Sequence, residues 1–185
     1  MRDVPNKKIY LDTETTGLSN TKHQILTIAL ILEDQNHTVH KETLKVKTQN
    51  HKEIDPKALE VNQIDIDEHN KESISASKTC KEINKIIRTN GFEDAVIVGH
   101  NVSFDIRFIK SLFQEQNISP VLNFENIHDT LILSKQVKET PTDFYNGGYD
   151  LESLSEHYGF TTEFHDAMND TEATRHLYRE IQKEL

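Results

Sequence analysis

Three strand-length apolar segments follow one another in the first 48 residues, and this order restricts the fold more than any other feature of the chain. Residues 8–11 are mostly apolar, residues 24–33 are rich in Ile and Leu, and residues 38–48 alternate apolar with polar side chains. Segments of this length predict three strands that pair as antiparallel neighbours. The chain is therefore expected to begin with a three-stranded meander.

Beyond residue 54 the pattern changes to helices and one further strand. Asp55 followed by Pro56 is typical of a helix start, and Asn90-Gly91 is typical of a helix end. The apolar residues 95–98, closed by Gly99, predict a buried strand. Helical spacing of apolar residues predicts further helices over residues 75–88, 102–116, 130–137, 151–158 and 166–184. We therefore expect an α/β protein with a mixed sheet flanked by helices on both faces.

The size and charge of the chain restrict its organisation and its partners. Its 185 residues suit one domain, so residues 1–185 are expected to form a single unit. Lys plus Arg number 21 against 31 Asp plus Glu, which gives a net charge of −10 and argues against binding nucleic acid by bulk charge. A polyanionic substrate would need local cations. Lys7, Lys57, Arg107 and Lys135 are candidates, although a solvated surface charge is the commoner role for each.

Three features bear on localisation. Cys80 is the one cysteine, which excludes a scaffold held by intrachain disulfides. The longest apolar stretch, residues 25–32, is far too short to cross a bilayer. The first residues include no apolar region that would act as a secretory signal. We therefore expect a cytoplasmic protein with no membrane partner.

Acidic residues at the ends of predicted elements point to a functional site. Asp12 and Glu14 are two residues apart where the first strand ends, so their side chains share one side. Asp105 and Asp170 each lie on the apolar stripe of a predicted helix, which directs them toward the core. Such like charges require cations, and Mg²⁺ and Mn²⁺ prefer oxygen ligands. Taken singly, these acids are as readily explained by solvation or by helix capping.

Other residues near these acids have alternative explanations. His165 is one of ten histidines, but beside bound cations it would be placed to take a proton from an attacking water. Asn101 and Asp129 are expected to cap helices, and for Asp129 a fifth metal ligand is the less favoured role. Phe104 is expected in the core, with stacking on a base as the alternative. The loop 141–149 is either a flap over the substrate or a long connection.

Three motifs resemble those of the DEDDh family of 3′–5′ exonucleases, which includes the epsilon proofreading subunit of bacterial DNA polymerase III and ribonuclease T. The motifs are Ile-Tyr-Leu-Asp12-Thr-Glu14-Thr-Thr-Gly17-Leu18, Gly99-His100-Asn101-x-x-Phe104-Asp105, and His165-x4-Asp170 followed by Glu172-Ala173-Thr174. They occur in the family's order over residues 9–174. The resemblance implies the ribonuclease H-like fold, a five-stranded mixed sheet whose middle strand is antiparallel to the rest.

The resemblance also implies a role for each motif residue. Four carboxylates would bind two divalent cations, Mg²⁺ or Mn²⁺, and these are Asp12, Glu14, Asp105 and Asp170. His165 would be the general base. Thr15 and Leu18 match positions that hold the 3′-terminal nucleotide, and Phe104 is a further candidate substrate contact. One departure concerns Asn62-Gln63-Ile64, which stands where many relatives have His-Gly-Ile.

The expected function is therefore that of a metal-dependent 3′–5′ exonuclease that releases nucleoside 5′-monophosphates. Single-stranded DNA ends are the favoured substrate, and a DNA polymerase is the expected partner if the activity serves proofreading. An exoribonuclease that trims RNA 3′ ends, similar to ribonuclease T or oligoribonuclease, is the alternative enzyme, because no residue here separates deoxyribose from ribose. The alternative from another class is a catalytically silent nucleic-acid-binding module, which the complete set of motif residues argues against.

Overall fold

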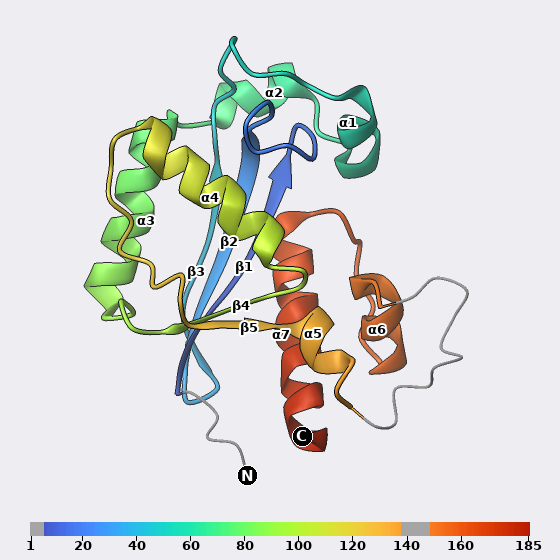
Figure 1. Cartoon of the computed structure of the whole chain (residues 1–185). Coiled ribbons are helices and arrows are strands. Elements are labelled where there is room, and N and C mark those ends of the chain that lie inside the picture. The colour runs from blue at the N-terminus through green and yellow to red at the C-terminus, as the bar shows by residue number, and fades with distance from the viewer. Residues whose placement is uncertain (1–5, 138–148) are drawn as a thin grey trace.

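The computed structural model describes residues 6–137 and 149–185, and its centre is a five-stranded sheet (Figure 1). The strands are β1 (Lys7–Thr15), β2 (Ile25–Asp34), β3 (His37–Lys45), β4 (Val96–Gly99) and β5 (Ile127–Asp129). They lie in the order β3-β2-β1-β4-β5, with β2 antiparallel to its neighbours β1 and β3, and with β4 parallel to both β1 and β5. The predicted five-stranded mixed sheet is confirmed. The expectation that the middle strand is the antiparallel one was wrong, because β1 is central and the antiparallel β2 is second in the order.

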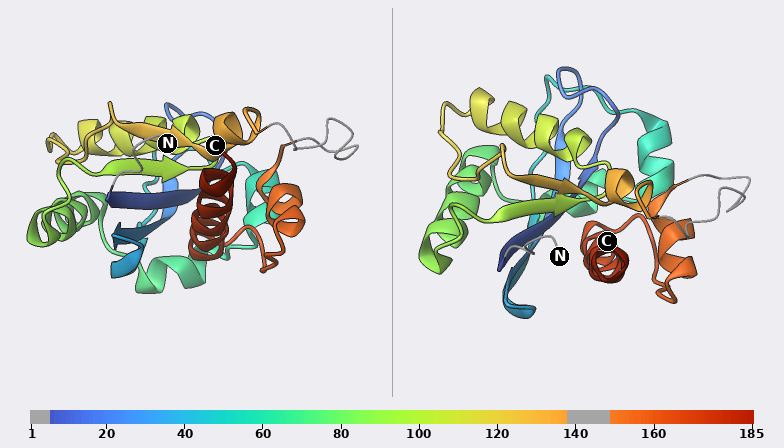
Figure 2. Two further views of the ribbon diagram at one scale, coloured as in Figure 1. Left: turned by 90° about the horizontal axis from the view of Figure 1, so that it is seen from below. Right: turned by 60° about the horizontal axis from the view of Figure 1, so that its bottom comes forward.

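Helices cover both faces of this sheet, as predicted (Figures 1 and 2). One face packs against α3 (Ala76–Asn90) and α4 (Ser103–Glu115). The other face packs against α7 (Ala167–Glu184), which also contacts α5 (Thr130–Ser134) and α6 (Leu151–His157). Two short helices, α1 (Pro56–Asn62) and α2 (Ile66–Glu72), lie between β3 and α3 in the chain. In the described residues, no helix combines the length and the apolar character that a membrane crossing requires.

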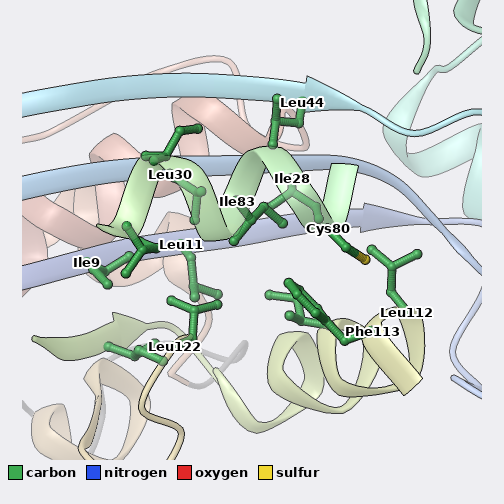
Figure 3. Packing of buried hydrophobic residues seen from close by; sticks show 14 of the residues in the cluster. Ile9, Leu11, Ile28, Leu30, Leu44, Cys80, Ile83, Leu112, Phe113 and Leu122 are labelled. Atoms are coloured by element: carbon green, nitrogen blue, oxygen red, sulfur yellow. The ribbon is translucent and has the colours of Figure 1, made fainter. Parts of the chain in front are cut away.

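The side chains of β1 alternate between the two helical layers. Ile9 and Leu11 point into the core shared with α3 and α4, where Figure 3 shows them near Ile83 and Leu122. Tyr10 packs on the opposite face against Tyr178 of α7, with the two ring centroids 5.9 Å apart. Successive side chains of a strand point to opposite faces, so the even-numbered residues of β1 face the α7 layer. This alternation places the two acids at the end of β1.

Helix boundaries follow the predicted capping residues. The Asp55 side chain accepts a hydrogen bond from the Lys57 backbone N–H, and Pro56 begins α1. In α3 the Ser75 hydroxyl accepts from the Lys78 N–H, and Gly91 ends the helix with a φ of +67°. Glycine adopts this left-handed conformation without the steric penalty that a Cβ brings. These starts and ends confirm the sequence prediction.

The expectation that Asn101 caps α4 was wrong. The residue before α4 is Val102, which provides no side-chain cap, and Asn101 is exposed with a φ of +54°. The Asp129 carboxylate accepts from both backbone N–H groups, at 2.9 Å from Asn101 and 3.1 Å from Val102. It also accepts from the Leu131 N–H at 3.0 Å, which confirms its predicted role as the cap of α5.

Two elements were not predicted from the sequence. Helix α2 has His69 as its one buried residue, so it shows no apolar stripe. Strand β5 has three residues, too few for a pattern of alternation to appear. The helix predicted over residues 130–137 ends at Ser134. Residues 141–148 of the predicted loop lie outside the described residues.

Candidate active site

The first two acids of the site lie at the carboxyl end of β1. Asp12 and Glu14 are on the face of the sheet that α7 covers, and both are half-buried. The register of β1 against β2 shifts between Glu14 and Thr15, so the strand becomes irregular directly after the second acid. Such irregularities bend a strand and re-aim its side chains. The local geometry thus ends the strand beside a pair of carboxylates.

The third acid comes from α7. Asp166 caps this helix by accepting hydrogen bonds from the Met168 and Asn169 N–H groups, so Asp170 lies in the first helical turn. One carboxylate oxygen from each of Asp12, Glu14 and Asp170 lies within 4.8 Å of the other two. Residues more than 150 positions apart in the chain are therefore brought to one point.

Asp105 reaches the same region from the opposite helical layer. It lies in the first turn of α4, is 4% exposed, and its Oδ1 accepts a 2.6 Å hydrogen bond from the Thr13 hydroxyl. Thr13 is the residue between the two acids of β1 and faces the α4 layer. Asp105 is not in the group whose oxygens lie within 4.8 Å of one another, but its charge acts on Asp12.

The pKa values of all four acids are raised because burial disfavours their charged forms. Burial, with the charges of Asp105 and Asp170, raises the pKa of Asp12 well above its ordinary value. Burial and the charge of Asp170 raise the pKa of Glu14 to about 8. Burial raises the pKa of Asp105 to about 7, against the lowering effect of the Thr13 hydrogen bond. Burial raises the pKa of Asp170 to about 6, against the hydrogen bond from the His165 N–H.

These acids fit a hard divalent cation. In the described part of the chain, Asp170 Oδ1 is buried and accepts no hydrogen bond, so it is available as a ligand atom. All the available donors are carboxylate oxygens, the type that Mg²⁺ and Mn²⁺ prefer. A bound cation would also offset the mutual repulsion that adds to the effect of burial on the pKa values of Asp12 and Glu14. The acidic cluster is thus compatible with metal binding.

His165 lies at the rim of this cluster. It is exposed, has a φ of +67°, and donates its backbone N–H to Asp170 Oδ2 at 3.3 Å. Its side chain and Glu14 line the same cleft. The structure therefore brings His165 to the acids without placing it among the possible cation ligands.

The three predicted substrate contacts lie around the same end of β1 and α4. Thr15 is buried, and its hydroxyl donates to the Gly17 carbonyl at 2.8 Å. Leu18 is 81% exposed, an unusual environment for a leucine. Phe104, one residue before Asp105, is half-buried and packs against Phe108 with ring centroids 4.9 Å apart. Leu18 is therefore available for contact with a ligand, and Phe104 contributes to the core.

A cleft of about 420 Å³ extends from Glu14 and His165 toward α2 and β3. Its lining includes Asn62, whose Nδ2 donates to the Thr15 carbonyl at 3.2 Å. It also includes Lys45 and Lys71, which are paired with acids of α2. Neither lysine was predicted as a local cation, since β3 and α2 come together only in the folded chain. Lys7, by contrast, is at the opposite end of β1, where it donates to the Gly91 carbonyl at 2.7 Å.

A five-stranded mixed sheet with carboxylates at the carboxyl end of β1 and in the first turns of α4 and α7 is the arrangement of a nuclease with the ribonuclease H-like fold. The sequence model of the exonuclease family RNase_T matches residues 9–178, and the chain belongs to this family. The predicted resemblance to DEDDh exonucleases is thereby confirmed.

Relatives include DNA polymerase III PolC-type proteins. The protein from Pediococcus pentosaceus is 30% identical over 173 residues, covering 92% of this chain, and that from Staphylococcus haemolyticus is 26% identical over 178 residues, covering 96%. In both cases the match covers 11% of the polymerase, so the chain spans about a tenth of the length of these relatives.

Solved structures of Escherichia coli exonuclease I have the same fold. The complex with a dT13 oligonucleotide matches with a TM-score of 0.83 at 18% identity, covering 97% of this chain and 41% of exonuclease I. The zinc-bound complex with single-stranded DNA matches with a TM-score of 0.81 over the same shares of the two chains. At this identity the likeness concerns the fold.

Proposed function

We propose that this chain is a two-metal-ion 3′–5′ exonuclease that acts on single-stranded DNA ends in the cytoplasm. The observation that carries the proposal is the convergence of Asp12, Glu14 and Asp170 within 4.8 Å, with Asp105 acting on Asp12 from the other layer. We further propose that residues 1–185 form one exonuclease domain, since a single sheet connects all the elements of the site.

In this mechanism the four carboxylates would hold two Mg²⁺ or Mn²⁺ ions. When bound, such ions supply the positive charge that allows a phosphodiester to approach the acids, and they favour both attack by water and departure of the 3′ oxygen. The His165 imidazole takes a proton from the attacking water. The new bond joins the water oxygen to phosphorus, the bond from phosphorus to the 3′ oxygen of the preceding nucleotide breaks, and that oxygen takes up a proton to become the new 3′ hydroxyl. The terminal residue leaves as a nucleoside 5′-monophosphate.

In this proposal, residues at and just after the carboxyl end of β1 position the terminal nucleotide of the substrate. The exposed Leu18 side chain would contact the terminal base, and the backbone at Thr15 would contact the terminal sugar. Phe104 supports this surface from α4 through its packing on Phe108. The buried Asn62 fixes the Thr15 carbonyl at the same place.

The similar proteins support DNA, rather than RNA, as the substrate. The relatives in sequence are DNA polymerases, and exonuclease I was solved with single-stranded DNA. The same relatives support a role in proofreading beside a polymerase. Trimming of RNA 3′ ends is the alternative activity, and the experiment below tests it alongside DNA hydrolysis.

The proposal is tested with matched DNA and RNA strands labelled at either the 3′ or the 5′ end. Incubation with Mn²⁺ should release the 3′ label first as a mononucleotide, and 5′-labelled DNA should shorten one nucleotide at a time. A chelator should stop both reactions. Asp12→Ala should lower the rate at least ~10³-fold, on the order expected when a metal-dependent step is lost.

The controls separate the alternatives. His157→Ala changes a histidine of α6 and should leave the rate unchanged. Faster digestion of RNA than of DNA would overturn the substrate assignment. Binding of strands with no metal-dependent shortening by the wild-type chain would identify a silent binding module instead.

A further inference from the structure

Four cations form one stripe on the outer face of α3. Lys78, Lys81, Lys85 and Arg88 are spaced three or four residues apart, and none of them is buried. This spacing places side chains on the same face of a helix, and ten residues at a rise of about 1.5 Å make the stripe about 15 Å long. In the described parts of the chain, Lys85 alone among the four is in an ion pair, with Glu82 at 2.7 Å.

The chain that carries this stripe has a net charge of −10, and the row of cations on α7, which consists of Arg175, Arg179 and Lys183, is paired with acids. The neighbouring α2 has three acids and one lysine, and α6 has two acids and no Lys or Arg. The exposed face of α3 therefore attracts an anionic partner, which the net charge of the chain repels.

Helix α4 lies in the same helical layer as α3 and reaches the proposed active site through Asp105. This helix begins beside the site, carries Asp105 in its first turn, and exposes Arg107 and Lys110 further along. It packs directly on α3: Figure 3 shows Cys80 and Ile83 of α3 beside Phe113 of α4. Both helices therefore cover the same face of the sheet.

We propose that these six cations form a basic path that binds the phosphate backbone of the strand on the 5′ side of the nucleotide in the active site. The path consists of Arg107, Lys110, Lys78, Lys81, Lys85 and Arg88. A row of cations along a surface suits single-stranded nucleic acid because its phosphates repeat regularly and binding releases their counterions. The proposal rests on the proposed function, and it explains how an acidic protein holds a polyanion beyond the last nucleotide.

The test compares Lys81→Gln/Lys85→Gln with the wild type on strands of two lengths. One strand has about 25 nucleotides, longer than a typical site of about 4–16, and the other has about 4. Fluorescence anisotropy without metal should show about tenfold weaker binding of the long strand at low salt. The slope of log affinity against log salt should fall by about 1.4, because each lysine that no longer neutralises a phosphate removes about 0.7 from it. KM for the long strand should rise, and hydrolysis of the short strand should not change.

A matched control removes two lysines from the other side of the molecule. Lys41→Gln/Lys183→Gln causes the same change in net charge on β3 and α7, where each lysine is in an ion pair, as Lys85 is on α3. It should leave binding of the long strand unchanged. Equal weakening by both variants, or none by the α3 variant, would overturn the basic path. If the wild-type chain hydrolyses neither strand, the proposed function fails, and the anisotropy data still decide whether the path binds DNA.

Discussion

At the end of β1, a single hydroxyl connects the two helical layers of the site. Thr13 lies between the acids that face α7, yet its own side chain faces α4 and donates to Asp105 Oδ1 at 2.6 Å. This hydrogen bond opposes the rise in the pKa of Asp105 that burial causes. A hydrogen bond to a carboxylate stabilises its charged form, which is the form that binds a cation. Thr13 therefore acts on the site through Asp105.

Replacing Thr13 with valine should weaken the site while keeping its shape. Valine retains the branched form that suits a strand but cannot donate, so the buried carboxylate loses its partner. A lost hydrogen bond to a charged group costs about 1.5–3 kcal/mol, and we expect roughly tenfold more Mn²⁺ to be needed for half-maximal activity. Metal titrations of the rate measure this shift. Thr79→Val, which removes a buried hydroxyl of α3 bonded to the Ser75 carbonyl, is the control and should leave the titration unchanged.

Replacing His165 is expected to lower the rate without removing metal binding, unlike replacing one of the acids. His165 has a φ of +67°, a conformation that asparagine tolerates better than most residues, so His165→Asn preserves the backbone while removing the proton acceptor. The rate should fall about 10²–10⁴-fold. Stabilisation by Mn²⁺, measured as a shift in melting temperature, should persist. Loss of the metal-induced shift together with the rate would contradict the assignment of His165 as a base outside the ligand set.

At the scale of elements, α1 ends in a strained position beside the site. Gln63 has a φ of +54° and donates its backbone N–H to the Leu59 carbonyl at 2.9 Å, and its side chain is exposed. A residue with a Cβ pays a steric penalty of about 1–2 kcal/mol in this conformation. The resemblance to the DEDDh family implies a glycine at this position, and the structure gives Gln63 the conformation for which glycine is suited.

Gln63→Gly should therefore stabilise the protein. The gain should be up to about 1 kcal/mol once the greater freedom of glycine in the unfolded chain is included, or about 2–4 °C in melting temperature. Thermal denaturation measures it, and Gln63→Ala, which keeps a Cβ, should show no gain. A lower melting temperature for the glycine variant would mean that the Gln63 side chain contributes more than its exposure indicates.

Asp129 joins β5 to the turn that begins α4. Its carboxylate accepts from the backbone of Asn101, Val102 and Leu131, so Asp129→Ala leaves three N–H groups without this partner. We expect a loss of about 2 kcal/mol, in the range for a lost cap, and a melting temperature lower by about 4–8 °C. Asp129→Asn keeps one acceptor oxygen and should lose about half as much. Equal melting temperatures for the wild type and the alanine variant would show that water replaces these contacts.

Across the whole molecule, the sequence predicts features that depend on residues close together in the chain, such as strand faces and helix ends. It does not predict which side chains from distant elements come into contact. Asp12 and Glu14 were identifiable because a two-residue separation fixes their common face in any strand. The helix ends at Asp55 and Gly91 follow from capping chemistry that is local to the chain. The cleft-lining Lys45 gives no such signal, because its neighbours come from α2. For the same reason Asp129 was identified as the cap of its own helix but not as the anchor of a turn 28 residues earlier.

The raised pKa values predict that the metal-free protein loses stability as the pH rises. Glu14, Asp105 and Asp170 titrate near pH 8, 7 and 6 in the folded protein but near pH 4 when unfolded, so between these limits the folded state binds more protons. The slope of the free energy of unfolding against pH is proportional to the protons bound in the unfolded state minus those bound in the folded state. This difference is negative here, so stability falls as the pH rises from about 4 to 8. Melting temperatures in a chelator should therefore be higher at about pH 5 than at about pH 8.

A divalent cation should reverse this dependence, since it binds the deprotonated carboxylates and has no comparable site in the unfolded chain. At a Mn²⁺ concentration about 100 times its dissociation constant, the stabilisation is about 2.7 kcal/mol, or about 5–10 °C for a protein of this size. The gain should be larger at about pH 8 than at about pH 5, where protons compete with the metal. Asp12→Ala removes one of the repelling charges, so its melting temperature in chelator at the higher pH should exceed that of the wild type, while Mn²⁺ should add little. A variant that is less stable in chelator, yet still stabilised by Mn²⁺, would show that the acids of β1 do not form the cation site.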